Sequence, residues 1–155
     1  MTPEEHQKIQ EEGIREVLSH AVVMRIAMAD NNMPYLVPVN FGYDGKYLYF
    51  HSKMKGKKLD VLAKNPAVCF EFDYGVELMP NEKACDWDTR FRSVIGYGTV
   101  KKLTENSEKK SGFDAIMQKY AGDHKFDYDE KHFSHAVLMK ITISEMKFKE
   151  SGDWG

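Results

Sequence analysis

A run of alternating side chains, interrupted by a two-residue turn, constrains the fold of this chain more than any other feature. Residues 35–72 read YLVPVNFGYDGKYLYFHSKMKGKKLDVLAKNPAVCFEF. Asp44-Gly45 lies between two stretches that alternate in polarity, which strongly indicates a β-hairpin. The segment predicts two strands, a short helix that stops before an Asn-Pro pair, and a returning strand. Their expected bounds are Tyr35–Tyr43, Lys46–Ser52, Lys57–Lys64 and Ala67–Asp73.

Two lysines stand where a helix normally disfavours cations. Gly56-Lys57-Lys58 opens the short helix, and the first turn of a helix already carries about half a positive charge. Each lysine costs ~0.3–1 kcal/mol there unless an anion is bound. A phosphate resting on the free N–H groups, with Ser52, Lys57 and Lys58 around it, would explain the placement. Lysines are also common on the solvated side of short helices, and this second reading stays open for the motif alone.

The remaining segments favour an antiparallel arrangement. A capped helix and a strand are expected before the hairpin. After it we expect an irregular connection, a strand, an amphipathic helix, a polar loop and a last strand with a frayed tail. Their bounds are Pro3–Ser19, Ala21–Ala29, Tyr74–Asp86, Trp87–Leu103, Glu105–Ala121, Asp123–Ser134 and Ala136–Phe148. With about six strands joined by hairpins or short helices, the pattern predicts a mainly β fold, an antiparallel barrel with appended helices.

Size and charge limit the functions that are open to the chain. Its 155 residues, 42% of them hydrophobic, are most simply one domain over residues 1–155. The net charge is −2 and only Lys53–Lys58 is a basic stretch, so we expect no nucleic-acid partner. No run approaches the ~20 apolar residues of a membrane span, so we expect a cytoplasmic chain without a membrane partner. The two cysteines make no disulfide framework, and the six histidines show no metal-ligand spacing, so no metal is expected.

Several short segments occur in an order and spacing that resemble a known family. They are Val37–Phe41, Tyr49–Ser52, Gly56–Leu59, Asn65-Pro66, Cys85–Trp87 and Arg92–Gly98. With these segments the chain resembles the pyridoxamine-phosphate-oxidase-like FMN-binding split barrels, and within them the 5-nitroimidazole-resistance group. No single segment is specific, but their order and spacing together are fairly specific. The resemblance covers nearly the whole chain.

The resemblance implies a six-stranded split barrel that forms a homodimer with two FMN sites at its interface. By position, Ser52, Lys57 and Lys58 would hold the phosphate of FMN. Backbone around Val39 and Asn40 would lie along the edge of the isoalloxazine ring.

The resemblance also assigns residues from elsewhere in the chain. Ser93 and Val94 would approach the flavin from the partner subunit. His51 would lie close to the cofactor or to the acceptor, where a pKa near neutrality would suit proton delivery. A structural place, as an edge histidine hydrogen-bonded to a neighbouring strand, stays open for His51 as well. Trp87 could line the flavin pocket or be a packed aromatic residue, and both alternatives stay open. Arg90 and Arg92 could pair with a phosphate or reach across the dimer, or they could lie on the solvated side of a strand.

The end of the chain departs from the pyridoxamine-phosphate oxidases. It reads KFKESGDWG, without the arginine set of their substrate pocket, which argues against oxidation of a vitamin B6 phosphate. One remaining function is an FMN-dependent reductase that passes electrons from a reduced nicotinamide or another donor to a small acceptor such as a nitroimidazole. The other is a flavin-binding electron carrier or sensor without turnover; a related barrel that holds a deazaflavin or haem is a weaker third. Because the chain has no Gly-x-Gly-x-x-Gly motif, a nicotinamide would bind only transiently.

Overall fold

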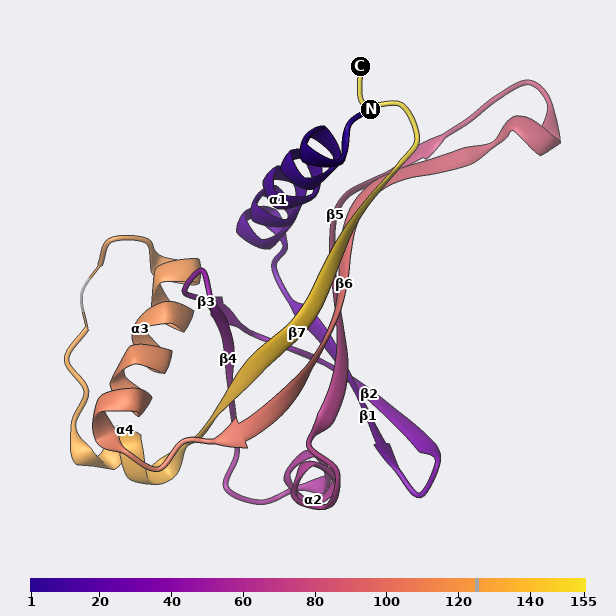
Figure 1. Ribbon diagram of the computed structural model, residues 1–155. Helices are drawn as coiled ribbons and strands as arrows, with labels where there is room; N and C mark the ends of the chain where they lie inside the picture. Colours follow the sequence, from indigo (N-terminus) through magenta and orange to yellow (C-terminus); the bar gives the residue numbers. More distant parts are fainter. Residues whose placement is uncertain (125) are drawn as a thin grey trace.

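One antiparallel sheet with four helices forms the described part of the molecule (Figure 1). The computed structural model describes residues 1–124 and 126–155, and the side chain of residue 132 is outside this description. The helices are α1 (Pro3–His20), α2 (Lys57–Lys64), α3 (Asn106–Ala121) and α4 (Glu130–His135). The strands are β1 (Met24–Asp30), β2 (Met33–Val39), β3 (Gly42–Tyr43), β4 (Tyr47–Ser52), β5 (Ala67–Met79), β6 (Asp88–Lys102) and β7 (Val137–Ser151). Their order in the sheet is β2-β1-β5-β6-β7-β4-β3.

The connection between β2 and β3 makes the sheet curl into a barrel. These two strands lie at opposite edges of the sheet, yet only Asn40 and Phe41 separate them in sequence. Three Cα–Cα steps span at most about 11 Å, so the two edges lie close together. Among the described strands no ladder joins these edges, and the barrel is therefore split. The predicted mainly β antiparallel split barrel is confirmed, with seven strands in place of six.

The extra strand arises because the expected hairpin pairs differently. β2 pairs along its whole length with β1, from Met24↔Val39 to Asp30↔Met33. Asn31 and Asn32 between them have φ values of 49° and 64°, the left-handed conformation that a tight two-residue hairpin turn requires. At Asp44-Gly45 a turn is present, but it joins β4 only to the two-residue β3. The predicted pairing of residues 35–43 with 46–52 is therefore wrong except at Gly42 and Tyr43.

The interior of the barrel is filled by aromatic and aliphatic side chains. Phe41, Phe50 and Phe72 are fully buried, and α1 adds Val17 and Leu18. Phe41 lies at the crossing from β2 to β3, and its N–H donates a hydrogen bond to the Tyr120 hydroxyl at 3.1 Å. This bond and the burial of the ring explain why the chain leaves β2 there.

Helix α3 packs closely on the outer side of the β3–β4 edge. A Cβ at Gly42 would lie 2.4 Å from the backbone of Ala115 and Ile116. Glycine at this position therefore allows the helix and the strand to touch. α3 thus covers β4 on the side opposite the barrel interior, and a cavity forms where this cover ends. Of the described helices, none has both the length and the apolar character needed to cross a lipid bilayer.

Strands β5 and β6 continue beyond the barrel as a two-stranded arm (Figure 1). Their ladder runs to Met79↔Asp88, with a bulge between Tyr74 and Glu77. The irregular connection predicted for residues 74–86 is therefore wrong, and the actual loop is residues 80–87. A short 3₁₀ turn, Ala84–Asp86, lies in this loop.

The ends of several predicted elements also differ from the structure. The polar loop predicted for residues 123–134 includes residue 125, which is outside the described residues, and its second half forms most of α4. The tail predicted to fray is packed. The Trp154 ring lies 4.0 Å from the Arg92 guanidinium carbon, and the indole N–H donates to the Ser151 carbonyl at 3.1 Å.

Candidate flavin site at the end of strand β4

Strand β4 presents its last two residues at the border between the barrel and α3. Leu48 and Phe50 point into the barrel interior and are fully buried, so the alternation of a strand turns Tyr49 and His51 to the other side. Pairing with β7 holds the end of β4 in place, with His51 opposite Leu138 and Ser52 opposite Val137. The chain then leaves the sheet and enters α2.

The first turn of α2 has the donors that bind a phosphate. Gly56, which caps the helix, has φ 149° and supplies no side-chain hydrogen bond. The first N–H groups of a helix have no partner within the helix, so they are available to an anion. Lys57 and Lys58 follow, and Ser52 adds a hydroxyl from the end of β4. A hydroxyl, two ammonium groups and backbone N–H groups together fit a phosphate monoester.

The two lysines differ in their surroundings. The Lys57 ammonium is exposed and lies 4.5 Å from the centre of the Tyr35 ring. Lys58 is half-buried, and burial lowers the pKa of its ammonium. An anion beside Lys58 would stabilise its charged form and oppose this effect of burial on the pKa.

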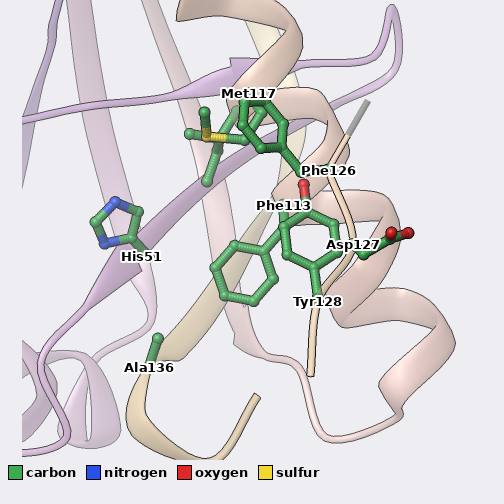
Figure 2. A pocket seen from close by; sticks show the side chains of 8 residues that line it. His51, Phe113, Met117, Phe126, Asp127, Tyr128 and Ala136 are labelled. Atoms are coloured by element: carbon green, nitrogen blue, oxygen red, sulfur yellow. The ribbon is translucent and has the colours of Figure 1, made fainter. Parts of the chain in front are cut away.

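His51 borders a cavity of about 400 Å³ between β4 and α3. Figure 2 shows the imidazole on one side of the cavity and a group of aromatic side chains on the other. Burial lowers the pKa of His51, and the positive charge of Lys58 lowers it further. The other lining residues are Phe113, Ile116, Met117, Phe126, Asp127, Tyr128 and Ala136.

The far wall of this cavity is apolar. In Figure 2 the Asp127 carboxylate points away from the cavity, on the far side of the Tyr128 ring. The Phe113 and Tyr128 rings stack with their centroids 5.3 Å apart. Burial, together with the charge of Asp114 and a hydrogen bond to it, raises the pKa of Tyr128 to about 12, so this phenol stays neutral. The cavity therefore suits a largely apolar molecule, with His51 as its titrating group.

Val39 and Asn40 lie near the same end of β4. Gly42 pairs with Tyr49, so Asn40, two residues before Gly42, and His51, two residues after Tyr49, flank one end of this short ladder. Asn40 is exposed and the side chain of Val39 is nearly buried. Their predicted contact with the flavin edge stays a prediction, and their position is compatible with it.

Ser93 and Val94 lie elsewhere in the same chain. Ser93 pairs with Lys149 of β7, whereas His51 pairs with Leu138, eleven residues earlier on that strand. At ~3.3 Å per residue this separation is ~35 Å along the strand. Both side chains are buried, Val94 fully. One chain therefore does not bring them to the end of β4, and their predicted approach from a partner subunit stays a prediction.

Comparisons with known proteins agree with this architecture. A family model described as pyridoxamine 5'-phosphate oxidase matches residues 10–150. The chain belongs to this family. Among solved structures, a candidate 5-nitroimidazole antibiotic resistance protein from Bacteroides thetaiotaomicron is 28% identical, with a TM-score of 0.79 over 89% of this chain and 82% of the other. The family resemblance inferred from the sequence is thereby confirmed.

More distant structures share the fold alone. A FAD- and haem-binding protein from Mycobacterium smegmatis is 17% identical, with a TM-score of 0.82 over 92% of this chain and 72% of the other. A FAD-binding protein from Mesorhizobium loti is 21% identical, with a TM-score of 0.62 over 98% and 96% of the two chains. No curated protein matches the chain.

The structure places further residues at the site that the sequence had not assigned to it. The helical periodicity of residues 105–121 marks Phe113, Ile116 and Met117 as one face, but gives no reason to place that face beside His51. Phe126 and Tyr128 lie in a segment predicted to be a polar loop. Their aromatic character within that polar segment was the available signal.

The two arginines of β6 make contacts within the chain. Arg92 pairs with Glu16 and Glu150, each at 2.7 Å, and Arg90 pairs with Glu77 at 2.6 Å. Arg92 therefore ties the base of the arm to α1 and to the end of β7, whereas Arg90 joins the two strands of the arm. Trp87 is half-exposed at the end of the arm.

Proposed function

We propose that this protein binds FMN and acts as a reductase that passes electrons to a small acceptor such as a nitroimidazole. The observation that carries this proposal is the adjacency of two features at the end of β4. One is the set of phosphate donors formed by Ser52 and the first turn of α2, and the other is the apolar cavity beside His51. When bound, the flavin would supply the electron transfer, and the protein would supply position, exclusion of water and a proton donor.

The donor set supports FMN over a larger or a phosphate-free flavin. The hydroxyl, the two lysines and the first N–H groups of the helix all lie in one short segment, residues 52–58, so the set suits a single phosphate. Riboflavin would leave these donors without an anion. FAD would place a second phosphate and an adenosine beyond them.

The cavity favours a reductase that turns over a small acceptor rather than a protein that only carries electrons. Its apolar wall would accept a planar heteroaromatic ring, and His51 lies at its edge, one residue before Ser52. We propose that His51 delivers a proton to the reduced acceptor. If the purified protein holds FMN but reduces no acceptor, it is the electron carrier or sensor that the sequence left open.

The outer face of the sheet supports a homodimer. By register, Tyr97 stands opposite Cys69 and Ile95 opposite Glu71, on the face opposite the barrel interior. Ile95 and Tyr97 are each about half-exposed, and Leu36 of β2 is 60% exposed on this same face. A face with apolar side chains at these positions is typical of a protein–protein interface. We propose that a second copy covers it.

The test is to purify the protein, release its cofactor by heat and separate it against FMN, FAD and riboflavin standards. Anaerobic assays with reduced nicotinamides and a panel of nitroimidazoles then measure turnover. We expect FMN and acceptor-dependent oxidation of the donor. Release of FAD, or of no flavin after reconstitution with FMN, would contradict the cofactor assignment.

A further inference from the structure

The cavity between β4 and α3 has a polar group at one end only. The imidazole of His51 borders it on the side of β4. On the other side, α3 contributes a ring, methyl groups and a thioether, from Phe113, Ile116 and Met117. A molecule in this cavity therefore meets one hydrogen-bonding side chain at the end of β4 and an apolar surface along α3.

Three packed rings close the far wall of the cavity. Phe113 of α3, Tyr128 and Phe133 of α4 lie with their ring centroids 5.3 to 6.1 Å apart. The hydroxyl oxygen of Tyr128 is buried and hydrogen-bonds to Asp114. It therefore has no surface on which a bound molecule could form a hydrogen bond. The wall is apolar even though one of its rings carries a hydroxyl group.

The outer side of this wall carries negative charge. Phe126 and Tyr128 are half-buried, whereas Asp127 and Asp129 are exposed, and the Asp127 carboxylate points away from the cavity (Figure 2). Among the described residues, no lysine or arginine lines the cavity. An anionic group that enters it would leave water without meeting a cation and would pass carboxylates on the way, so the field disfavours anions.

Desolvation sets how many polar groups the cavity tolerates. The positive charge of Lys58 and burial both lower the pKa of His51, so the imidazole is neutral at pH 7 and offers one N–H donor. It can satisfy one polar group of a bound molecule. A second polar group would lose its hydrogen bonds to water and gain none, and apolar pockets reject an added hydroxyl by about 10- to 100-fold. A charged group is rejected more strongly.

We propose that the cavity selects an uncharged electron acceptor whose only polar group is the one that is reduced. This group lies at His51, and the apolar body of the molecule extends to Met117 and the three rings. The inference rests on the proposed function and narrows its substrate class. A nitroarene with an alkyl substituent belongs to this class, and a nitroimidazole belongs to it only where its ring substituents are apolar.

The reduction that this placement serves is balanced. A nitro group that becomes a nitroso group takes up two electrons and two protons and loses one oxygen as water. The two electrons and one proton come from reduced FMN, and the second proton comes from solvent through His51. The polar end of the molecule must therefore lie at His51, and the rest of it must fill the apolar part of the cavity.

Four para-substituted nitrobenzenes test this selectivity in the FMN-loaded protein. Their substituents are ethyl, 2-hydroxyethyl, carboxymethyl and 2-aminoethyl, and in each a methylene group separates the polar atoms from the ring, so the nitro groups are almost equally reducible. We expect kcat/KM for the alcohol to be about 10- to 100-fold below that for the ethyl compound. The two charged compounds should be poorer still. Equal values across the series, or preference for a charged member, would overturn the proposal.

Equilibrium binding measures the same selectivity without turnover. The four compounds compete with the neutral fluorescent probe N-phenyl-1-naphthylamine for the oxidised, FMN-loaded protein, with no electron donor present. We expect the dissociation constants to follow the order of kcat/KM. Equal affinity for the ethyl compound and the alcohol would contradict the inference. If the protein binds the compounds in the expected order but reduces none of them, the reductase proposal fails and the selectivity of the cavity stands.

A methionine variant tests where the apolar body lies. Met117 is only partly buried, and Met117→Gln keeps the length of the side chain while it adds an amide to the apolar wall. One new hydrogen bond to the alcohol should reduce its deficit against the ethyl compound by roughly three- to tenfold. Met33→Gln, at a methionine of β2 that is 66% exposed, is the matched control and should leave the ratio unchanged. An unchanged ratio in Met117→Gln would overturn the assigned orientation.

Discussion

Removal of the two lysines at the start of α2 should weaken FMN binding and leave riboflavin binding almost unchanged. Lys58 is half-buried, so a charge-assisted contact with phosphate is worth ~1.5–3 kcal/mol there. Lys57 is exposed, and solvent reduces its share to ~0.5–1 kcal/mol. The double change Lys57→Ala, Lys58→Ala should therefore cost ~2–4 kcal/mol, which is ~30- to 1,000-fold in Kd.

Isothermal titration calorimetry on the apoprotein, with FMN and riboflavin in parallel, measures this difference. Two adjacent exposed lysines at the end of β6 serve as the matched control, Lys101→Ala with Lys102→Ala. We expect that control to bind both flavins as the wild type does. The effect on FMN should also shrink with added salt, since Lys57 is open to solvent. Equal losses for FMN and riboflavin would refute the assignment of the phosphate to this helix end.

Three further outcomes follow from single residues. His51→Ala should keep FMN but lower the rate of acceptor reduction by ~10²–10⁴-fold. Since the pKa of His51 is lowered, the wild-type rate should fall as the pH rises through a value below the ordinary ~6.5. A mutant with the native rate and the native pH profile would exclude this role. Burial and the neighbouring Asp73 raise the pKa of Glu71 to about 7, although the charge of Arg25 opposes this shift. The folded state therefore keeps a proton that the unfolded state loses near pH 4.5, so the stability to urea should fall as the pH rises from about 4.5 to 7. Glu71→Gln should flatten that slope. Arg92→Ala removes the ion pairs to Glu16 and Glu150 and the contact with Trp154, and should lower the free energy of unfolding by ~2–3 kcal/mol. Arg92→Lys should recover part of this loss. An unchanged urea midpoint for the alanine variant would show that these contacts do not stabilise the fold.

Local signals in the sequence were sufficient where an element is bounded by its own residues. Helix α2 has the predicted bounds, Lys57–Lys64, because Gly56 precedes it and Asn65-Pro66 ends it. The strand that follows begins where it was expected, at Ala67. In such cases the residues that stop an element are adjacent to it, and no distant contact has to be known.

Strand pairing was harder to predict than strand position. Asp44-Gly45 is the stronger turn signal, yet Asn31-Asn32 joins the longer hairpin. An alternating segment can pair with either neighbour, and its polarity pattern does not choose between them. The burial of Phe41 in the barrel interior decides the pairing, because the chain leaves the β2 ladder at this residue. The cavity beside His51 likewise depends on a contact between distant segments, because its other side is formed by α3. The sequence indicated the end of β4 as a site but did not reveal that α3 lies beside it.

The arm shows most clearly how a distant residue can override a local signal. An irregular connection was predicted for residues 74–86, which contain Gly75 and Pro80. Gly75 instead lies in a β-bulge with φ 70°, a conformation that disfavours other residues. A Cβ at this position would also meet the Trp154 ring at 2.3 Å. Glycine is thus required by the bulge and by a side chain from the far end of the sequence. Because Trp154 also packs on Arg90 and Arg92, the C-terminus fixes the direction of the arm at its base.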